Sequence, residues 1–157
     1  MDNRISDSGV TSTFHFVNYK IDKIDFQLEP MTNNIVCQKQ NVDVEFGIAF
    51  SNALKFEERE NKTFYVSRLQ AKVDLFNNKE VLAKGIFSIS GIFSTENAFS
   101  EEVEQNLIKN QAPAILLPYL RAAITNILAS SGFDTVILPL VNIQAAAKTA
   151  HIEIESI

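Results

Sequence analysis

The side chains that could carry out chemistry in this sequence are few and widely separated. His15 and His151 lie near opposite ends of the chain, so no spacing places them on one metal ion. The single cysteine, Cys37, has no neighbouring base that would activate it as a nucleophile. The sequence also lacks a glycine-rich phosphate loop and a G-x-S-x-G elbow. We therefore expect no enzyme activity, no metal and no cofactor.

Two acidic clusters have simple structural explanations. The glutamates within 57–60 fit a solvated loop between two strands. The glutamates within 101–104 follow Ser100, which is a favourable N-cap residue, and acids are favoured in the first turn of a helix. Neither cluster predicts catalysis.

Composition excludes several classes of protein. A formal net charge of −5 and a pI near 5.0 argue against nucleic-acid binding, which needs a basic surface. One cysteine excludes an internal disulfide and suits a reducing cytosol. The polar N-terminus has no signal-peptide core, and no stretch reaches the ~20 apolar residues of a membrane span. We expect a cytoplasmic protein with a flexible tail at 1–13 and one domain at 14–157.

The strongest candidate for function is an apolar connector near the C-terminus. The chain has twelve phenylalanines and no tryptophan, and most of these rings belong in a core. The segment 133–141 has no helical pattern, yet it is apolar. Such a segment either packs on its own subunit or leaves a groove for extended apolar chains. The residues concerned are Phe133, Ile137, Leu138, Leu140 and Ile143.

Alternating apolar and polar residues predict the strands of the sheet that this connector would pack against. The alternation predicts strands over 14–29, 42–50, 68–75 and 81–93, with a turn at Asn77-Asn78. Short connections suggest an antiparallel meander with one packed face. Gly85 and Gly91 suggest a bulge or a close approach of another backbone.

The remaining residues predict helices over the packed face. A short amphipathic helix is expected over 101–108, and a longer one over 114–131 that ends at Gly132. Prolines stand at 113 and 118, and the longer helix is expected to begin near Ala114, because proline is tolerated in the first turn of a helix but costs ~3 kcal/mol in its interior. Asn142 caps a short final helix through the alanines at 145–147. Residues 151–157 fit a strand or a tail.

The longer helix is apolar on more sides than one sheet covers, so we expect its outer side to meet another subunit. Four chains of 17.6 kDa would give a tetramer of about 70 kDa. The expected interface residues are Leu116, Leu120, Ile124, Ile127 and Leu128.

Four segments resemble one family in their order and spacing. Residues 85–92, 113–121, 132–133 and 138–143 are similar to segments of the SecB protein-export chaperones, and the likeness extends over about 14–147. The resemblance implies an α+β fold: a four-stranded antiparallel sheet on a long helix, a crossover connector and a short second helix, assembled as a dimer of dimers. It also implies a holdase that binds non-native chains without ATP and passes them to the SecA motor.

The resemblance assigns two surfaces. Client grooves lie along the connector and second helix, which places the five connector residues named above in the groove wall. SecA docking uses an acidic patch on the exposed sheet face; here Glu80 keeps one acid, but Lys23 and Gln27 stand where acids are expected. A chaperone dedicated to one client, such as the antitoxin of a toxin–antitoxin module, is therefore an alternative. A scaffold oligomer that binds one folded partner is another.

Overall fold

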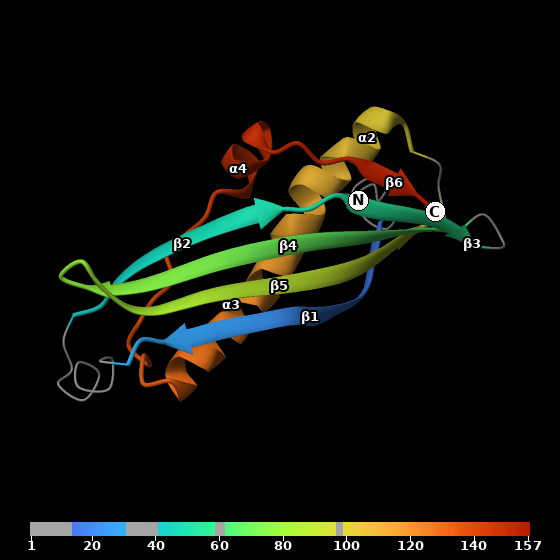
Figure 1. Ribbon diagram of the computed structural model, residues 1–157. Coiled ribbons are helices and arrows are strands. Elements are labelled where there is room, and N and C mark those ends of the chain that lie inside the picture. The colour runs from blue at the N-terminus through green and yellow to red at the C-terminus, as the bar shows by residue number, and fades with distance from the viewer. Residues whose placement is uncertain (1–13, 31–40, 59–61, 97–98) are drawn as a thin grey trace, which may run out of the picture.

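The computed structural model describes residues 14–30, 41–58, 62–96 and 99–157. One sheet forms a layer, and a long helix crosses one of its faces, while no helix of the described residues lies on the opposite face (Figure 1). The strands are β1 (His15–Leu28), β2 (Asp43–Phe50), β3 (Ala53–Glu58), β4 (Lys62–Asn77), β5 (Glu80–Thr95) and β6 (Ile154–Ser156). The helical elements are α2 (Glu101–Asn106), η1 (Leu107–Gln111), α3 (Ala112–Ser130) and α4 (Ile143–Thr149). The expected tail at 1–13 and Cys37 lie outside the described residues.

Among the described residues the sheet has six strands, so the predicted four-stranded antiparallel meander was wrong in both number and order. Its order is β1-β5-β4-β3-β6, with β2 also paired to β4, so the first strand lies beside β5 rather than beside β2. β2 and β3 follow one another along β4, with a break at Ser51-Asn52. β6 runs parallel to β3, which makes the sheet mixed. Residues 57–58, expected in a loop, end β3 instead.

The predicted alternation is confirmed in β2. Val44, Phe46, Ile48 and Phe50 pair with alternate residues of β4 that are fully buried. The intervening residues of β2 are exposed, so one face of the strand is packed and the other is wet. The turn at Asn77-Asn78 also forms, with positive φ at Asn78 and Lys79 that suits a tight hairpin.

The two predicted helices are one nearly continuous helical segment. Ser100 caps α2 as expected, since its hydroxyl accepts from the Val103 amide. η1 is a π-helical turn, in which the Ala112 amide reaches back to the Leu107 carbonyl, and it joins α2 to α3 without a break. Pro118 stays inside α3 because the carbonyl that it leaves unpaired belongs to exposed Ala114, where water can reach it.

The helix α3 ends as predicted at Gly132. Gly132 has φ 91°, its amide bonds the Ala129 carbonyl, and the Phe133 amide bonds the Leu128 carbonyl at 2.8 Å. These two bonds form a Schellman motif, in which the residue after the glycine turns back against the helix. Phe133 is buried for this reason. Glu101–Ser130 is also long and apolar enough to span a membrane by length and composition, a property that core helices of soluble proteins share.

The α3 helix approaches β5 closely at Gly91. A Cβ at this position would lie 2.5 Å from Cδ2 of Leu116, which is fully buried and has no room to move. A close approach was expected here, but a side chain of α3 makes it rather than another backbone. We predict that Gly91→Val lowers the free energy of unfolding by about 1–3 kcal/mol, because overpacking a tight core forces strain. Denaturant titration measures the change.

Gly47 provides the matched control. It lies on β2, and a Cβ added there would have nothing within 4 Å, so Gly47→Val should leave stability unchanged or raise it. Equal losses at the two positions would show that the Gly91 contact does not limit side-chain size.

Candidate functional site

Exposed apolar side chains gather in two places on the described part of the chain. The first is the connector between α3 and α4, where Ile137 is 86% exposed and Leu140 is 93% exposed. The second is the edge strand β1 with the adjoining part of α3, where four side chains of β1 and one of α3 are 39–53% exposed. These five are Val17, Tyr19, Ile24, Leu28 and Tyr119. Large exposed apolar side chains are the ones that a bound partner would cover.

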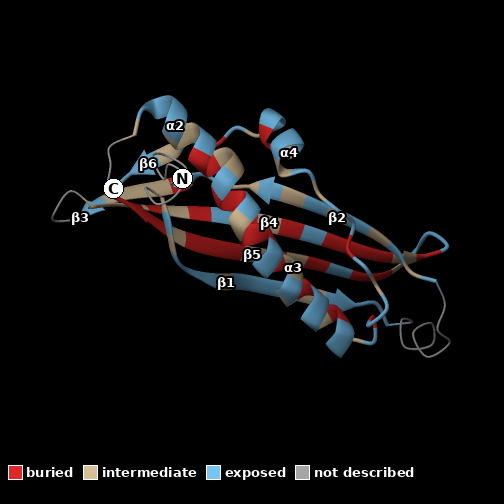
Figure 2. Cartoon of the chain, turned by 180° about the vertical axis from the view of Figure 1, so that it is seen from behind, coloured by how far each residue is buried: buried red, intermediate tan, exposed pale blue. Residues whose placement is uncertain are grey.

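The connector is fixed in place although it has no regular structure. Arg121 of α3 donates to the carbonyls of Pro139 at 2.6 Å and Leu138 at 2.8 Å, and its guanidinium lies over the Phe46 ring. Leu138 is itself buried. In Figure 2 the connector passes in front of the sheet, on the face that α3 crosses, from the end of α3 to α4. It therefore presents Ile137 and Leu140 to solvent on either side of a buried anchor.

The structure divides the five predicted client-binding residues. Ile137 and Leu140 are exposed, and Ile143 is half-buried against the core at the start of α4. Phe133 and Leu138 are core residues with 2% and 4% of their surface exposed, so they hold the connector and offer no surface to a client. Sequence reasoning missed Arg121, although a lone arginine in an apolar helix was a signal for such a contact.

A ladder of aromatic rings supports the β1 edge. Phe14 stacks on Phe93, Phe16 also packs against Phe93, and Tyr19 packs against Tyr119 with ring centroids 4.3 Å apart. The ladder ends in the two half-exposed tyrosines. In the described residues β1 pairs only with β5, so its outer edge is open for 14 residues. The alternation predicted the strand but could not show that it forms an edge.

Most of the predicted interface residues of α3 lie in the chain's own core. Leu116, Leu120, Ile124 and Leu128 are at most 1% exposed, and Ile127 is half-buried. These residues pack in one core with the sheet and with Phe133 and Leu138 of the connector. The premise that one sheet leaves one side of the helix uncovered therefore needs correction.

The predicted docking residues are exposed side chains on β1 and β5. Lys23 lies opposite Ser88, Gln27 lies opposite Lys84, and Glu80 begins β5 at the hairpin. Near Gln27 the face carries Asp74, whose Oδ2 is 3.7 Å from the Lys72 ammonium. Opposite charges therefore lie beside one another at this end of the face.

A buried ion cluster attaches α2 to the sheet. One carboxylate oxygen of Glu104 accepts from the Tyr65 hydroxyl at 2.7 Å and lies 2.9 Å from the Lys55 ammonium. Burial raises the pKa of the Tyr65 hydroxyl, and the hydrogen bond and negative charge of Glu104 raise it further. Glu104, expected only as a helix-start charge, thus joins α2, β3 and β4.

This cluster predicts a specific response to alkaline pH. The folded state holds the Tyr65 proton more tightly than the unfolded chain, whose tyrosine pKa is 10.0. The stabilisation is therefore fully present below pH 10 and is lost as the pH rises above that value. We predict that between pH 10 and about pH 11 the wild type loses up to about 1.4 kcal/mol more stability than Tyr65→Phe. Unfolding titrations of both proteins across this range measure the difference, and parallel profiles would contradict it.

The described residues include no candidate metal site. No group of three His, Cys, Asp or Glu side chains in this part of the chain could hold a metal ion. His151 is exposed and lies 3.3 Å from Glu153. A hollow of about 660 Å³ between α2 and the C-terminal strand is lined by both lysines and glutamates, together with His151 and two isoleucines.

Comparison with known proteins identifies the family. The family model for the preprotein translocase subunit SecB matches residues 23–151. A solved SecB-like chaperone of Mycobacterium tuberculosis, in complex with a ChAD peptide from an antitoxin, has the same fold: the TM-score is 0.63 at 12% identity, over 82% of this chain and 91% of that one. A Streptococcus agalactiae protein of unknown function gives a TM-score of 0.41 at 9% identity, over 82% and 97%. No curated protein matches the sequence. Because the family match spans most of the chain, this protein belongs to the SecB family of chaperones.

Proposed function

We propose that the protein is an ATP-independent holdase that binds non-native polypeptides through the connector. The observation that carries this proposal is the near-complete exposure of Ile137 and Leu140 on a segment that Arg121 and Leu138 hold in place. A soluble domain that fixes large apolar side chains in solvent has a partner that covers them. An unfolded chain, with apolar side chains exposed along its length, is such a partner.

The energetics favour a binder with several weak contacts. Burying one leucine or isoleucine side chain contributes about 1.5–3 kcal/mol, so two per chain give only weak binding alone. Repetition of the contact in an oligomer raises the effective affinity, because one long client reaches several connectors. Weak, repeated apolar contacts also carry little sequence preference.

We also propose a homotetramer of about 70 kDa, four times 17.6 kDa, built as a dimer of dimers. The open edge of β1 supports this assembly, because a long unpaired strand with apolar side chains is a template for pairing with another chain. A second copy that adds its own β1 would satisfy the edge and cover Ile24 and Leu28.

The experiment that tests holdase function is suppression of aggregation without ATP. Several unrelated proteins are diluted from denaturant into buffer with and without this protein, and light scattering is followed. Protection of all of them at stoichiometric amounts supports a general holdase. Protection of none, together with binding to one folded protein, would support the scaffold alternative.

A dedicated client is the second candidate. The structural neighbour from Mycobacterium tuberculosis holds a peptide from an antitoxin, which gives this candidate an observed example in the same fold. A protein of this kind would protect one unstable antitoxin and few other chains. Copurification from the native host separates the two: many clients favour the general holdase, and one antitoxin favours the dedicated chaperone.

Transfer to SecA in the cytoplasm completes the proposal for the Sec pathway. Mixed charges around Gln27 and Lys84 give little net potential beyond a Debye length of ~8 Å, so electrostatic steering of a basic module is weak. Docking to SecA through this face should therefore be weaker and more sensitive to salt than docking through an acidic face.

A further inference from the structure

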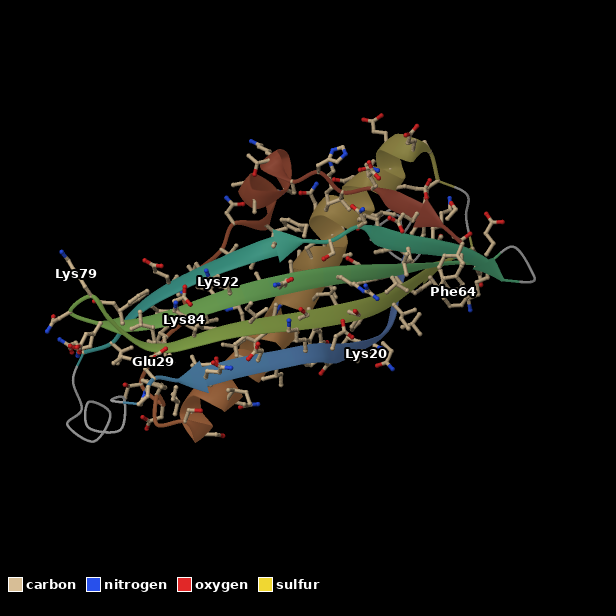
Figure 3. All side chains as sticks on the ribbon, in the orientation of Figure 1. Lys20, Glu29, Phe64, Lys72, Lys79 and Lys84 are labelled. Carbon is tan, nitrogen blue, oxygen red and sulfur yellow. The ribbon has the colours of Figure 1, made fainter. Side chains whose placement is uncertain are left out.

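The sheet face opposite α3 is divided into zones of different chemistry along the strands. The strand pairings place side chains of β1, β5, β4 and β3 in rows across the sheet. At the β3 end the rows are apolar: Ile92 lies beside Val66, which lies beside Leu54, and the stacked rings of Phe64 and Phe56 lie beyond. In Figure 3 Phe64 and Lys20 are at this end of the face, and Lys84 and Lys79 are toward the other.

The next two rows are basic. Ser90 lies between Lys20 of β1 and Arg68 of β4, and Ser88 lies between Lys23 and Gln70. The carboxylate in these rows is Asp22, which accepts a hydrogen bond from Ser90 and lies 3.9 Å from the Lys20 ammonium. These rows therefore carry three cations and one carboxylate, and that carboxylate is already bound to Ser90 and lies near Lys20. The rows further on carry both signs, with Asp25, Lys72, Lys84, Asp74 and Glu45.

A β-bulge places the two lysines on the same face. Lys20 and Lys23 are three residues apart, so strict alternation would place them on opposite faces. The register shifts between Ile21 and Lys23, which inserts Asp22 as an extra residue. Bulges of this kind re-aim side chains, and here the result is a basic zone that the alternation does not predict.

Two adjoining hollows follow these zones. One, of about 270 Å³, is lined by Leu54, Val66 and Ile92 together with Lys20 and Arg68. The other, of about 410 Å³, is lined by Asp22, Lys23, Gln70 and Ser88, and Arg68 lines it as well. An extended chain that lies along the strands would thus pass from an apolar floor onto cations within two residues, because alternate residues of a strand are about 7 Å apart.

We propose that this face is a docking site for an extended acidic segment of a partner protein. The segment carries an apolar residue over Leu54 and Val66 and carboxylates two and four residues further on, over Arg68 and Lys23. Charge complementarity favours an acidic segment, because its carboxylates would be attracted to the three cations, whereas a basic module would be repelled by them. A long nucleic acid fits poorly, because Asp25, Asp74 and Glu45 limit the basic rows and the chain has a net charge of −5. The proposal goes beyond client holding, which uses the opposite side of the sheet.

The test uses the whole protein and synthetic labelled peptides. The acidic probe has a leucine followed by aspartates two and four residues later; a second probe has asparagines in their place. Lys20→Gln with Arg68→Gln removes two cations from the site, and Lys79→Gln with Lys84→Gln removes two from the far end of the same face. We expect the first pair to weaken binding of the acidic probe by about tenfold and the second pair by less than about twofold, measured by fluorescence anisotropy.

Each outcome bears on the proposal separately from holdase function, because aggregation suppression is measured on the same variants. Loss of the acidic probe in the first pair alone, with unchanged suppression, supports the site. Equal binding of the asparagine probe, or equal losses in both pairs, would overturn it. An oligonucleotide of equal length that binds more tightly and depends on the same two cations would replace the acidic segment with a phosphate ligand.

Discussion

Replacing Ile137 and Leu140 together with serine is expected to lower the affinity for an unfolded client by about tenfold or more. Each side chain loses the apolar surface that a client would cover, which contributes about 1.5–3 kcal/mol when fully buried. The melting temperature should not change, because the two side chains are 86% and 93% exposed and make few contacts in the folded chain. Anisotropy of a labelled unfolded protein and thermal unfolding measure the two effects.

Two comparisons make this prediction sharp. Val103→Ser with Ile157→Ser removes exposed apolar side chains elsewhere on the surface and should leave client affinity unchanged. Phe133→Ala should instead cost about 3–5 kcal/mol of stability, because it empties a core position under the Schellman motif. If the Ile137 and Leu140 variant holds clients as well as the wild type, the connector is not the client surface.

The connector shows why exposure could not be predicted from residue type. Phe133, Leu138 and Leu140 are all large, apolar and close in sequence, yet the first two are core residues and the third is almost fully exposed. An irregular segment has no repeating period, so position along the chain does not indicate which side faces inward. The Schellman turn and the Arg121 contacts decide it, and these depend on where α3 lies on the sheet.

Local signals were more reliable than pairing signals. The caps at Ser100 and Asn142, the glycine at 132 and the Asn77-Asn78 turn formed as predicted, because each depends on a few neighbouring residues. The position of β1 beside β5 could not be predicted from the sequence, because strand order depends on long-range pairing that alternation does not encode. The bulge at Asp22 was missed for a related reason. The extra residue can be recognised only from the register in which β1 pairs with β5, and that register is not encoded in the alternation.

The assembly proposal predicts a large change from substitutions on the β1 edge. Val17→Lys with Ile24→Lys should reduce the mass in solution from about 70 kDa to that of a smaller species, because lysine on an edge strand opposes pairing with a second copy. Both side chains are about half exposed within one chain, so the fold should remain. Multi-angle light scattering at micromolar concentration measures the mass, and circular dichroism checks the fold.

The core of α3 supplies the contrast, because Ile124 is fully buried within the chain. Ile124→Asp places a charge there without a partner and should unfold the protein rather than separate intact subunits. Val103→Lys, on the exposed side of α2, introduces a charge at a similarly exposed apolar residue and should leave the mass unchanged.

A wild-type protein that scatters as a monomer would contradict the assembly proposal, whereas a tetramer that survives both β1 substitutions would show that the interface lies away from β1. Since avidity in holdase function requires several connectors in one particle, a dissociated but folded β1 variant should also protect clients less well than the wild type.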